Sequence, residues 1–198
     1  MLTRLKVRNF KQFEDVEIDL GKAVVLIGPN NSGKTTALQA LALWEIGIRR
    51  WNEKRMGKSS PEKRPGVTIN RRDLVSIPVP YANLLWRDLH VRNVERIESR
   101  GKKSSKTNNI RIEIIVGGVT GGNAWECGLE FDYANDESFY CRPLRTDPGA
   151  TGRMPVPSEA GDVQMAFLPP MSGLADREFL KQPGEISVLI GQGQTAQV

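Results

Sequence analysis

The chain has 198 residues, of which 39% are hydrophobic and 26% are charged, enough apolar content for one folded domain or one lobe of a larger one. No apolar run reaches the roughly 18 residues of a membrane-spanning helix, so we expect a cytoplasmic protein without a membrane partner. Two cysteines and one histidine exclude a disulfide framework and argue against a histidine-based metal cluster or a Ser-His-Asp triad.

The N-terminal quarter predicts two strands, a third strand and a helix. Alternation of apolar and polar residues indicates strands over 2–8 and 13–20 that pair as a hairpin. The unbroken apolar run 23–27 ends at Gly28 and is typical of a strand buried on both faces, as in a central parallel sheet. Apolar residues at helical spacing then predict an amphipathic helix over 34–48.

The remaining elements are less regular. Residues 49–79 are charged and rich in proline, so we interpret them as an insertion. An amphipathic helix is predicted over 81–91, in which we expect Trp86 to pack in the core and His90 to lie at the surface. The tail over 186–198 begins like a helix. Further strands are predicted over 110–116, 124–133, 138–141 and 163–168.

The net charge of +5 is unevenly distributed. Residues 1–48 carry +1, residues 49–107 carry +10 and residues 108–198 carry −6. A basic block of this kind is typical of a surface that contacts a polyanion such as DNA. A solvated insertion with the same composition is the alternative, and composition does not decide between them.

Residues 28–35 read Gly-Pro-Asn-Asn-Ser-Gly-Lys-Thr and match the phosphate-binding pattern G-x-x-x-x-G-K-[ST]. In such a loop the backbone amides form a nest for phosphate oxygens, and the following helix adds its positive end. Lys34 would neutralise phosphate charge as the catalytic residue, and the Thr35 hydroxyl would ligate Mg²⁺. The predicted ATP-binding residues are Gly28, Pro29, Asn30, Asn31, Ser32, Gly33, Lys34, Thr35 and Thr36.

Two segments together carry a family resemblance. Asn9-Phe10-Lys11 between two predicted strands, followed by the run from Leu26 to Thr36, resembles the ABC-type ATPase heads of the RecF, SMC and double-strand-break-repair group, with the OLD-type ATPases as relatives. The resemblance is specific over residues 1–48. It implies an α/β fold, the N-terminal lobe of a P-loop NTPase, with a mixed sheet and P-loop helix beside an antiparallel β layer. It further implies that Lys11 approaches the nucleotide.

The chain departs from this family in two motifs. It has no apolar run followed by Asp-Glu, the Walker B motif, because Leu129-Glu130-Phe131-Asp132 is interrupted by a charge, and it has no Leu-Ser-Gly-Gly-Gln signature. We therefore expect residues 1–198 to be one lobe of a longer protein, weak in ATP binding and nearly inactive alone. Its segments would be 1–48 (hairpin, P-loop strand and helix), 49–107 (basic insertion) and 108–198 (β-rich).

The resemblance also implies partners: a second ATPase lobe, a head-to-head dimer partner, DNA and a possible nuclease subunit. Two other functions stay open from the residues themselves. One is a self-contained P-loop nucleoside or small-molecule kinase, disfavoured because a hairpin precedes the phosphate loop. The other is a nucleic-acid-binding or regulatory module that binds ATP without hydrolysing it. The sequence does not distinguish repair, chromosome maintenance and phage defence.

Overall fold

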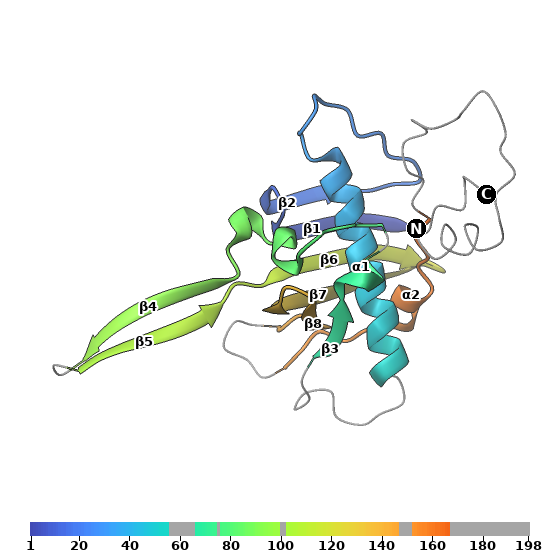
Figure 1. The fold of residues 1–198 in the computed structure, drawn as a ribbon. Helices are drawn as coiled ribbons and strands as arrows, with labels where there is room; N and C mark the ends of the chain where they lie inside the picture. Colours follow the sequence, from blue (N-terminus) through green and yellow to red (C-terminus); the bar gives the residue numbers. More distant parts are fainter. Residues whose placement is uncertain (56–65, 75, 100–101, 147–151, 167–198) are drawn as a thin grey trace, which may run out of the picture.

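The computed structural model describes residues 1–55, 66–74, 76–99, 102–146 and 152–166. Its centre is a six-stranded sheet in the order β2-β1-β6-β7-β8-β3, with every pair antiparallel, and helix α1 (Lys34–Arg55) lies across one face (Figure 1). The strands of this sheet are β1 (Leu2–Phe10), β2 (Phe13–Asp19), β3 (Val67–Asn70), β6 (Ile112–Thr120), β7 (Asn123–Asn135) and β8 (Ser138–Pro143).

The predicted N-terminal hairpin is confirmed. β1 pairs with β2 from Arg4 opposite Asp19 to Phe10 opposite Phe13. Successive side chains of a strand point to opposite faces, which places buried Leu5 and Val7 toward α1 and the charged Arg4, Lys6 and Arg8 on the other face. The α/β class is therefore confirmed, but the sheet is antiparallel in all its described pairs, where a mixed sheet was expected.

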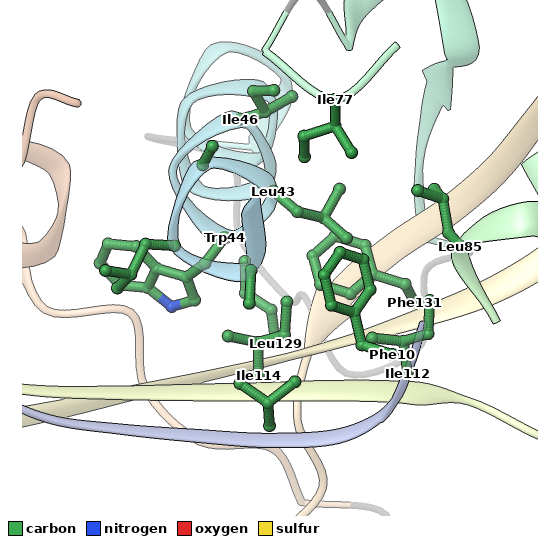
Figure 2. Close-up of a cluster of buried hydrophobic side chains, with 14 of the residues drawn as sticks. Phe10, Leu43, Trp44, Ile46, Ile77, Leu85, Ile112, Ile114, Leu129 and Phe131 are labelled. Atoms are coloured by element: carbon green, nitrogen blue, oxygen red, sulfur yellow. The ribbon is translucent and has the colours of Figure 1, made fainter. Parts of the chain in front are cut away.

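The core lies between α1 and the sheet (Figure 2). Trp44 and Leu43 of α1 have no exposed surface, and they pack with apolar side chains of β6 and β7 such as Ile114 and Leu129. The Trp44 indole N–H donates to the Cys127 carbonyl oxygen at 3.0 Å, so the one polar atom of this ring is satisfied inside the core. Burial of this helix face holds α1 against the sheet and thereby positions the loop that precedes it.

The strand predicted over 23–27 is not formed. Ala23–Ile27 has no regular secondary structure, and the side chains of Val25 and Ile27 are 80% and 90% exposed. An apolar run becomes a buried strand only where neighbouring strands pair with both of its edges, and none of the described strands borders this segment. The prediction was wrong because pairing partners, not the run itself, decide this structure.

The prediction of a helix over 81–91 is also wrong. Two short 3₁₀ turns, η2 (Ala82–Leu85) and η3 (Arg87–Leu89), stand there instead, separated by Trp86 in an extended conformation. Trp86 bridges to Phe10, and its buried indole N–H donates to the Ile110 carbonyl oxygen at 2.7 Å. This long-range pairing outweighs the local helical pattern. Packing of Trp86 and exposure of His90 are as predicted.

The segment interpreted as an insertion contributes to the main body. α1 continues past residue 48 to Arg55 because Trp51 is also buried, and β3 pairs with β8 at the edge of the sheet. A short 3₁₀ turn, η1 (Arg71–Asp73), follows β3. Two further strands, β4 (Arg92–Ser99) and β5 (Lys102–Asn109), form a ribbon that projects away from the sheet (Figure 1).

The C-terminal predictions are partly confirmed. β7 and β8 cover the strands expected over 124–133 and 138–141, and β6 begins at Ile112, two residues after the start of the strand expected over 110–116. A short helix α2 (Ser158–Gly161) stands where only loop was expected. The strand predicted over 163–168 is absent from its described part, residues 163–166, and the predicted tail over 186–198 lies outside the described residues. No helix in the described ranges is long and apolar enough to cross a membrane.

Candidate nucleotide-binding site

The glycine-rich loop over 28–33 leads directly into α1. The Ala37 N–H donates to the Gly33 carbonyl oxygen at 2.9 Å, which is the first helical hydrogen bond, and a tight turn joins the Ser32 N–H to the Pro29 carbonyl oxygen at 3.3 Å. The first amides of a helix lack partners within the helix and attract anions. Residues 28–32 are exposed, so this loop presents backbone amides beside the helix N-terminus to solvent.

Lys34 lies folded back over the loop. Its ammonium group donates to the carbonyl oxygens of Gly28 at 2.7 Å and Pro29 at 2.6 Å, and to the Ser32 hydroxyl at 3.2 Å. The positive charge therefore sits directly at the predicted phosphate nest. Of the two threonines that follow, Thr35 is exposed and Thr36 is buried, which leaves the Thr35 side chain accessible to a ligand.

The turn between β1 and β2 packs against this loop. The Gln12 carboxamide lies between the Asn31 carbonyl oxygen and the Gly33 N–H, and the amide orientation that satisfies both neighbours donates to Asn31 at 3.1 Å and accepts from the Gly33 N–H. Gly33 has φ +94°, and a Cβ on it would lie 2.5 Å from a Phe13 ring carbon, so only glycine fits this contact. Gln12 was not predicted as a site residue, and its position directly after Lys11 was the signal in the sequence that could have pointed to it.

Lys11 is held against α1. Its ammonium donates to the Gln39 side-chain oxygen at 2.7 Å, and its backbone N–H donates to the Leu85 carbonyl oxygen at 2.9 Å. Burial lowers the pKa of the Lys11 ammonium below its usual value, because the charged form loses solvation. Lys11 therefore joins the turn between β1 and β2 to α1, beside Gln12, which contacts the loop. Its contact with a nucleotide stays a prediction.

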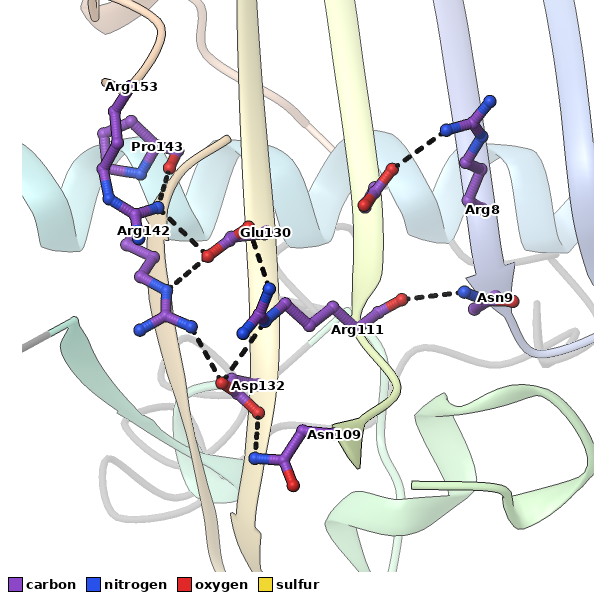
Figure 3. A network of polar contacts seen from close by, with 10 residues as sticks. Arg8, Asn9, Asn109, Arg111, Glu130, Asp132, Arg142, Pro143 and Arg153 are labelled. Carbon is purple, nitrogen blue, oxygen red and sulfur yellow. Dashed lines mark hydrogen bonds and ion pairs between the residues drawn. The ribbon is translucent and has the colours of Figure 1, made fainter. Parts of the chain in front are cut away.

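The two carboxylates nearest in pattern to a Walker B motif are engaged elsewhere. Glu130 and Asp132 of β7 lie on the face of the sheet opposite α1, where arginines surround them (Figure 3). Their partners are Arg142 for both carboxylates, Arg153 at 3.0 Å for Glu130, and Asn109 at 2.8 Å and Arg111 at 3.5 Å for Asp132. These carboxylates therefore neutralise arginines on the face of the sheet that α1 does not cover.

The described residues contain no group of three or more His, Cys, Asp or Glu side chains that could hold a metal ion. The two thiols are unsuited to ligation as well. Burial raises the pKa of Cys127 to about 12, and it raises the pKa of Cys141 well above its usual range, so both remain protonated. Within the described ranges, the exposed Thr35 hydroxyl therefore remains the predicted metal ligand.

Comparison with known proteins supports a nucleotide site. A family model described as "AAA ATPase domain" matches residues 1–114, more than half of the 198-residue chain. A segment of 43 residues is 49% identical to the protein named OLD nuclease of Thermus scotoductus. This match covers 22% of the chain and 8% of the length of that relative. Because the family model spans the hairpin, the loop and α1, the chain belongs to the AAA ATPase domain family.

Proposed function

We propose that the chain is the ATP-binding lobe of a RecF- and SMC-like ATPase that couples the binding and hydrolysis of ATP to DNA transactions. The observation that carries the proposal is the glycine-rich loop at the start of α1, with the Lys34 ammonium held against its carbonyl oxygens. The phosphate oxygens of ATP would accept hydrogen bonds from the loop amides, and Lys34 would balance the phosphate charge. Mg²⁺ would take the Thr35 hydroxyl as one ligand.

The order of elements favours this function over a kinase. The β1–β2 hairpin precedes the loop and touches it through Gln12, so it belongs to the site and is more than an N-terminal extension. The similarity of a short segment to OLD nuclease points in the same direction.

Glu130 and Asp132, the acidic residues nearest in pattern to a Walker B motif, are bound to arginines, so they do not offer the acidic group that hydrolysis requires. We propose that a second lobe supplies it. The exposed run over 23–27 supports this idea, since Val25 and Ile27 leave apolar surface open and none of the described strands pairs with this segment.

DNA would be contacted by the basic middle of the chain. The β4–β5 ribbon projects from the body, and residues 92–109 contain six basic and two acidic residues. On the body, Arg50 and Arg71 pair with Asp73 and Glu137, each within 3 Å. Because the ribbon projects from the body and is rich in basic residues, it is the segment that we favour for phosphate contacts.

The test is calorimetric titration of the chain with Mg²⁺-ATP. Lys34→Ala removes charge-assisted hydrogen bonds worth roughly 1.5–3 kcal/mol each, so the affinity should fall at least about tenfold. Lys22→Ala is the matched control, because Lys22 is an exposed lysine in the segment before the loop. Equal affinities for the wild type and Lys34→Ala would refute the proposed site. A loss of affinity in Lys22→Ala alone would show that ATP binds at a different place.

A further inference from the structure

Gln12 holds two backbone groups of the phosphate loop. Its carboxamide nitrogen donates to the Asn31 carbonyl oxygen at 3.1 Å, and its oxygen accepts from the Gly33 N–H. The amide orientation follows from these two neighbours, one an acceptor and the other a donor. Gly33 is buried, and a buried backbone N–H needs an acceptor. Gln12 supplies this acceptor without bringing a negative charge to the loop.

We propose that Gln12 is a neutral placeholder for a phosphate oxygen at the Gly33 N–H, an inference that rests on the proposed ATP site. A bound phosphate would take the same donor that the Gln12 oxygen now uses. The exchange favours phosphate because hydrogen bonds to an ionised acceptor are stronger than those to a neutral one. The Lys34 ammonium and the N-terminus of α1 add to this preference, since both attract an anion more strongly than a neutral carboxamide.

The backbone of this turn is anchored, so the exchange involves the Gln12 side chain alone. The Lys11 N–H donates to the Leu85 carbonyl oxygen at 2.9 Å, and the Lys11 ammonium is bound to Gln39 of α1. Phe10, just before the turn, is fully buried and bridges to Trp86. A side chain with three rotatable bonds on such an anchored backbone can leave the Gly33 N–H without a change of fold.

Three variants separate a placeholder from a structural support. Gln12→Ala removes the competing acceptor, and Gln12→Glu replaces it with an anion that accepts from the same N–H and repels phosphate. Asn123→Asp is the control for Gln12→Glu, because it makes the same amide-to-carboxylate change at an exposed position. Asn123 is the first residue of β7, directly after the turn from β6, at the opposite end of the sheet from Gln12.

Each variant is titrated with Mg²⁺-ATP and with inorganic tripolyphosphate at low and high salt. Gln12→Ala should bind both at least as tightly as the wild type. Gln12→Glu should bind both at least about tenfold more weakly at low salt, with a smaller loss at high salt, because salt screens the repulsion. Asn123→Asp should match the wild type.

Two results would overturn the inference while leaving the ATP site intact. One is a loss of more than about threefold in Gln12→Ala, which would make the carboxamide a support that stays in the bound state. The other is a Gln12→Glu variant that binds like Asn123→Asp. If wild type and Lys34→Ala bind alike, however, the proposed function itself fails, and this outcome is distinct from both.

Discussion

Truncation of the buried carboxylate Glu130 should destabilise the chain strongly. Glu130 is 1% exposed, and its carboxylate accepts from Arg142 and from Arg153, the latter at 3.0 Å. The side chains of these arginines are only 18% and 11% exposed, so Glu130→Ala leaves two guanidinium groups poorly solvated and short of a counter-charge. Removing one partner of a buried ion pair costs about 3–5 kcal/mol, and we expect a loss at the lower end because Arg142 keeps its bond to Asp132.

Glu113→Ala is the matched control for this change. Glu113 of β6 lies directly opposite Glu130 of β7, and its carboxylate pairs with Arg8 at 3.3 Å. Both of these side chains are solvated, 28% and 45% exposed, so the expected cost is at most about 1 kcal/mol.

The measurement is urea unfolding followed by circular dichroism at low and high salt. The Glu130→Ala loss should persist at high salt, whereas the smaller Glu113→Ala loss should shrink, since screening acts on exposed pairs. Glu130→Gln should recover part of the loss because it keeps a hydrogen-bond acceptor. Equal costs for Glu113→Ala and Glu130→Ala would show that burial of the network does not govern its energetics.

Three further predictions concern the loop, the thiols and the ribbon. Gly33→Ala should reduce the affinity for ATP at least about tenfold in calorimetry, because φ +94° and the Phe13 contact both exclude a Cβ. An unchanged affinity would mean that the loop backbone adjusts to the added Cβ without disturbing the site. The raised pKa of Cys127 means that the unfolded chain releases this proton at a lower pH than the folded chain. The free energy of unfolding should therefore fall as the pH rises from about 9 toward 12, and Cys127→Ala should reduce the slope in urea titrations at several pH values. If the β4–β5 ribbon binds DNA phosphates, five neutralised phosphates would give a log–log salt slope near about −4.5. Replacing the ribbon's basic residues by glutamine should flatten this slope by about 0.9 for each phosphate that is no longer neutralised, whereas an unchanged slope would favour a solvated insertion.

Much of the sheet could be predicted from the sequence because its strands alternate buried residues with more exposed ones. In β1 the buried Leu5 and Val7 alternate with charged residues, and burial also alternates along β8 and the first five residues of β6. The loop over 28–33 and the start of α1 were predictable for a different reason: glycine spacing and helical periodicity are local properties of the chain. The finer roles of these residues toward ATP and Mg²⁺ stay predictions.

Predictions failed where distant residues decide the local structure. Ala23–Ile27 has the composition of a buried strand, but a strand needs partners along its edges, and none of the described strands provides one. Residues 81–91 have a helical pattern, but Trp86 pairs with Phe10, 76 positions earlier, and its extended backbone interrupts the helix. In both cases tertiary pairing outweighs local preference, which is worth only a few tenths of a kcal/mol per residue.

By itself the sequence determined the hairpin, the phosphate-loop pattern and the helix that follows it, since each depends on residues close together in the chain. Only the tertiary structure decided that Gln12 reaches Asn31 and Gly33, because the turn and the loop meet through packing of the hairpin on α1. Tertiary structure likewise decided that Glu130 neutralises arginines, because strand pairing brings β7 beside β8 and the segment that carries Arg153 folds back over them. Contacts of this kind depend on long-range burial and register, which composition and periodicity do not encode.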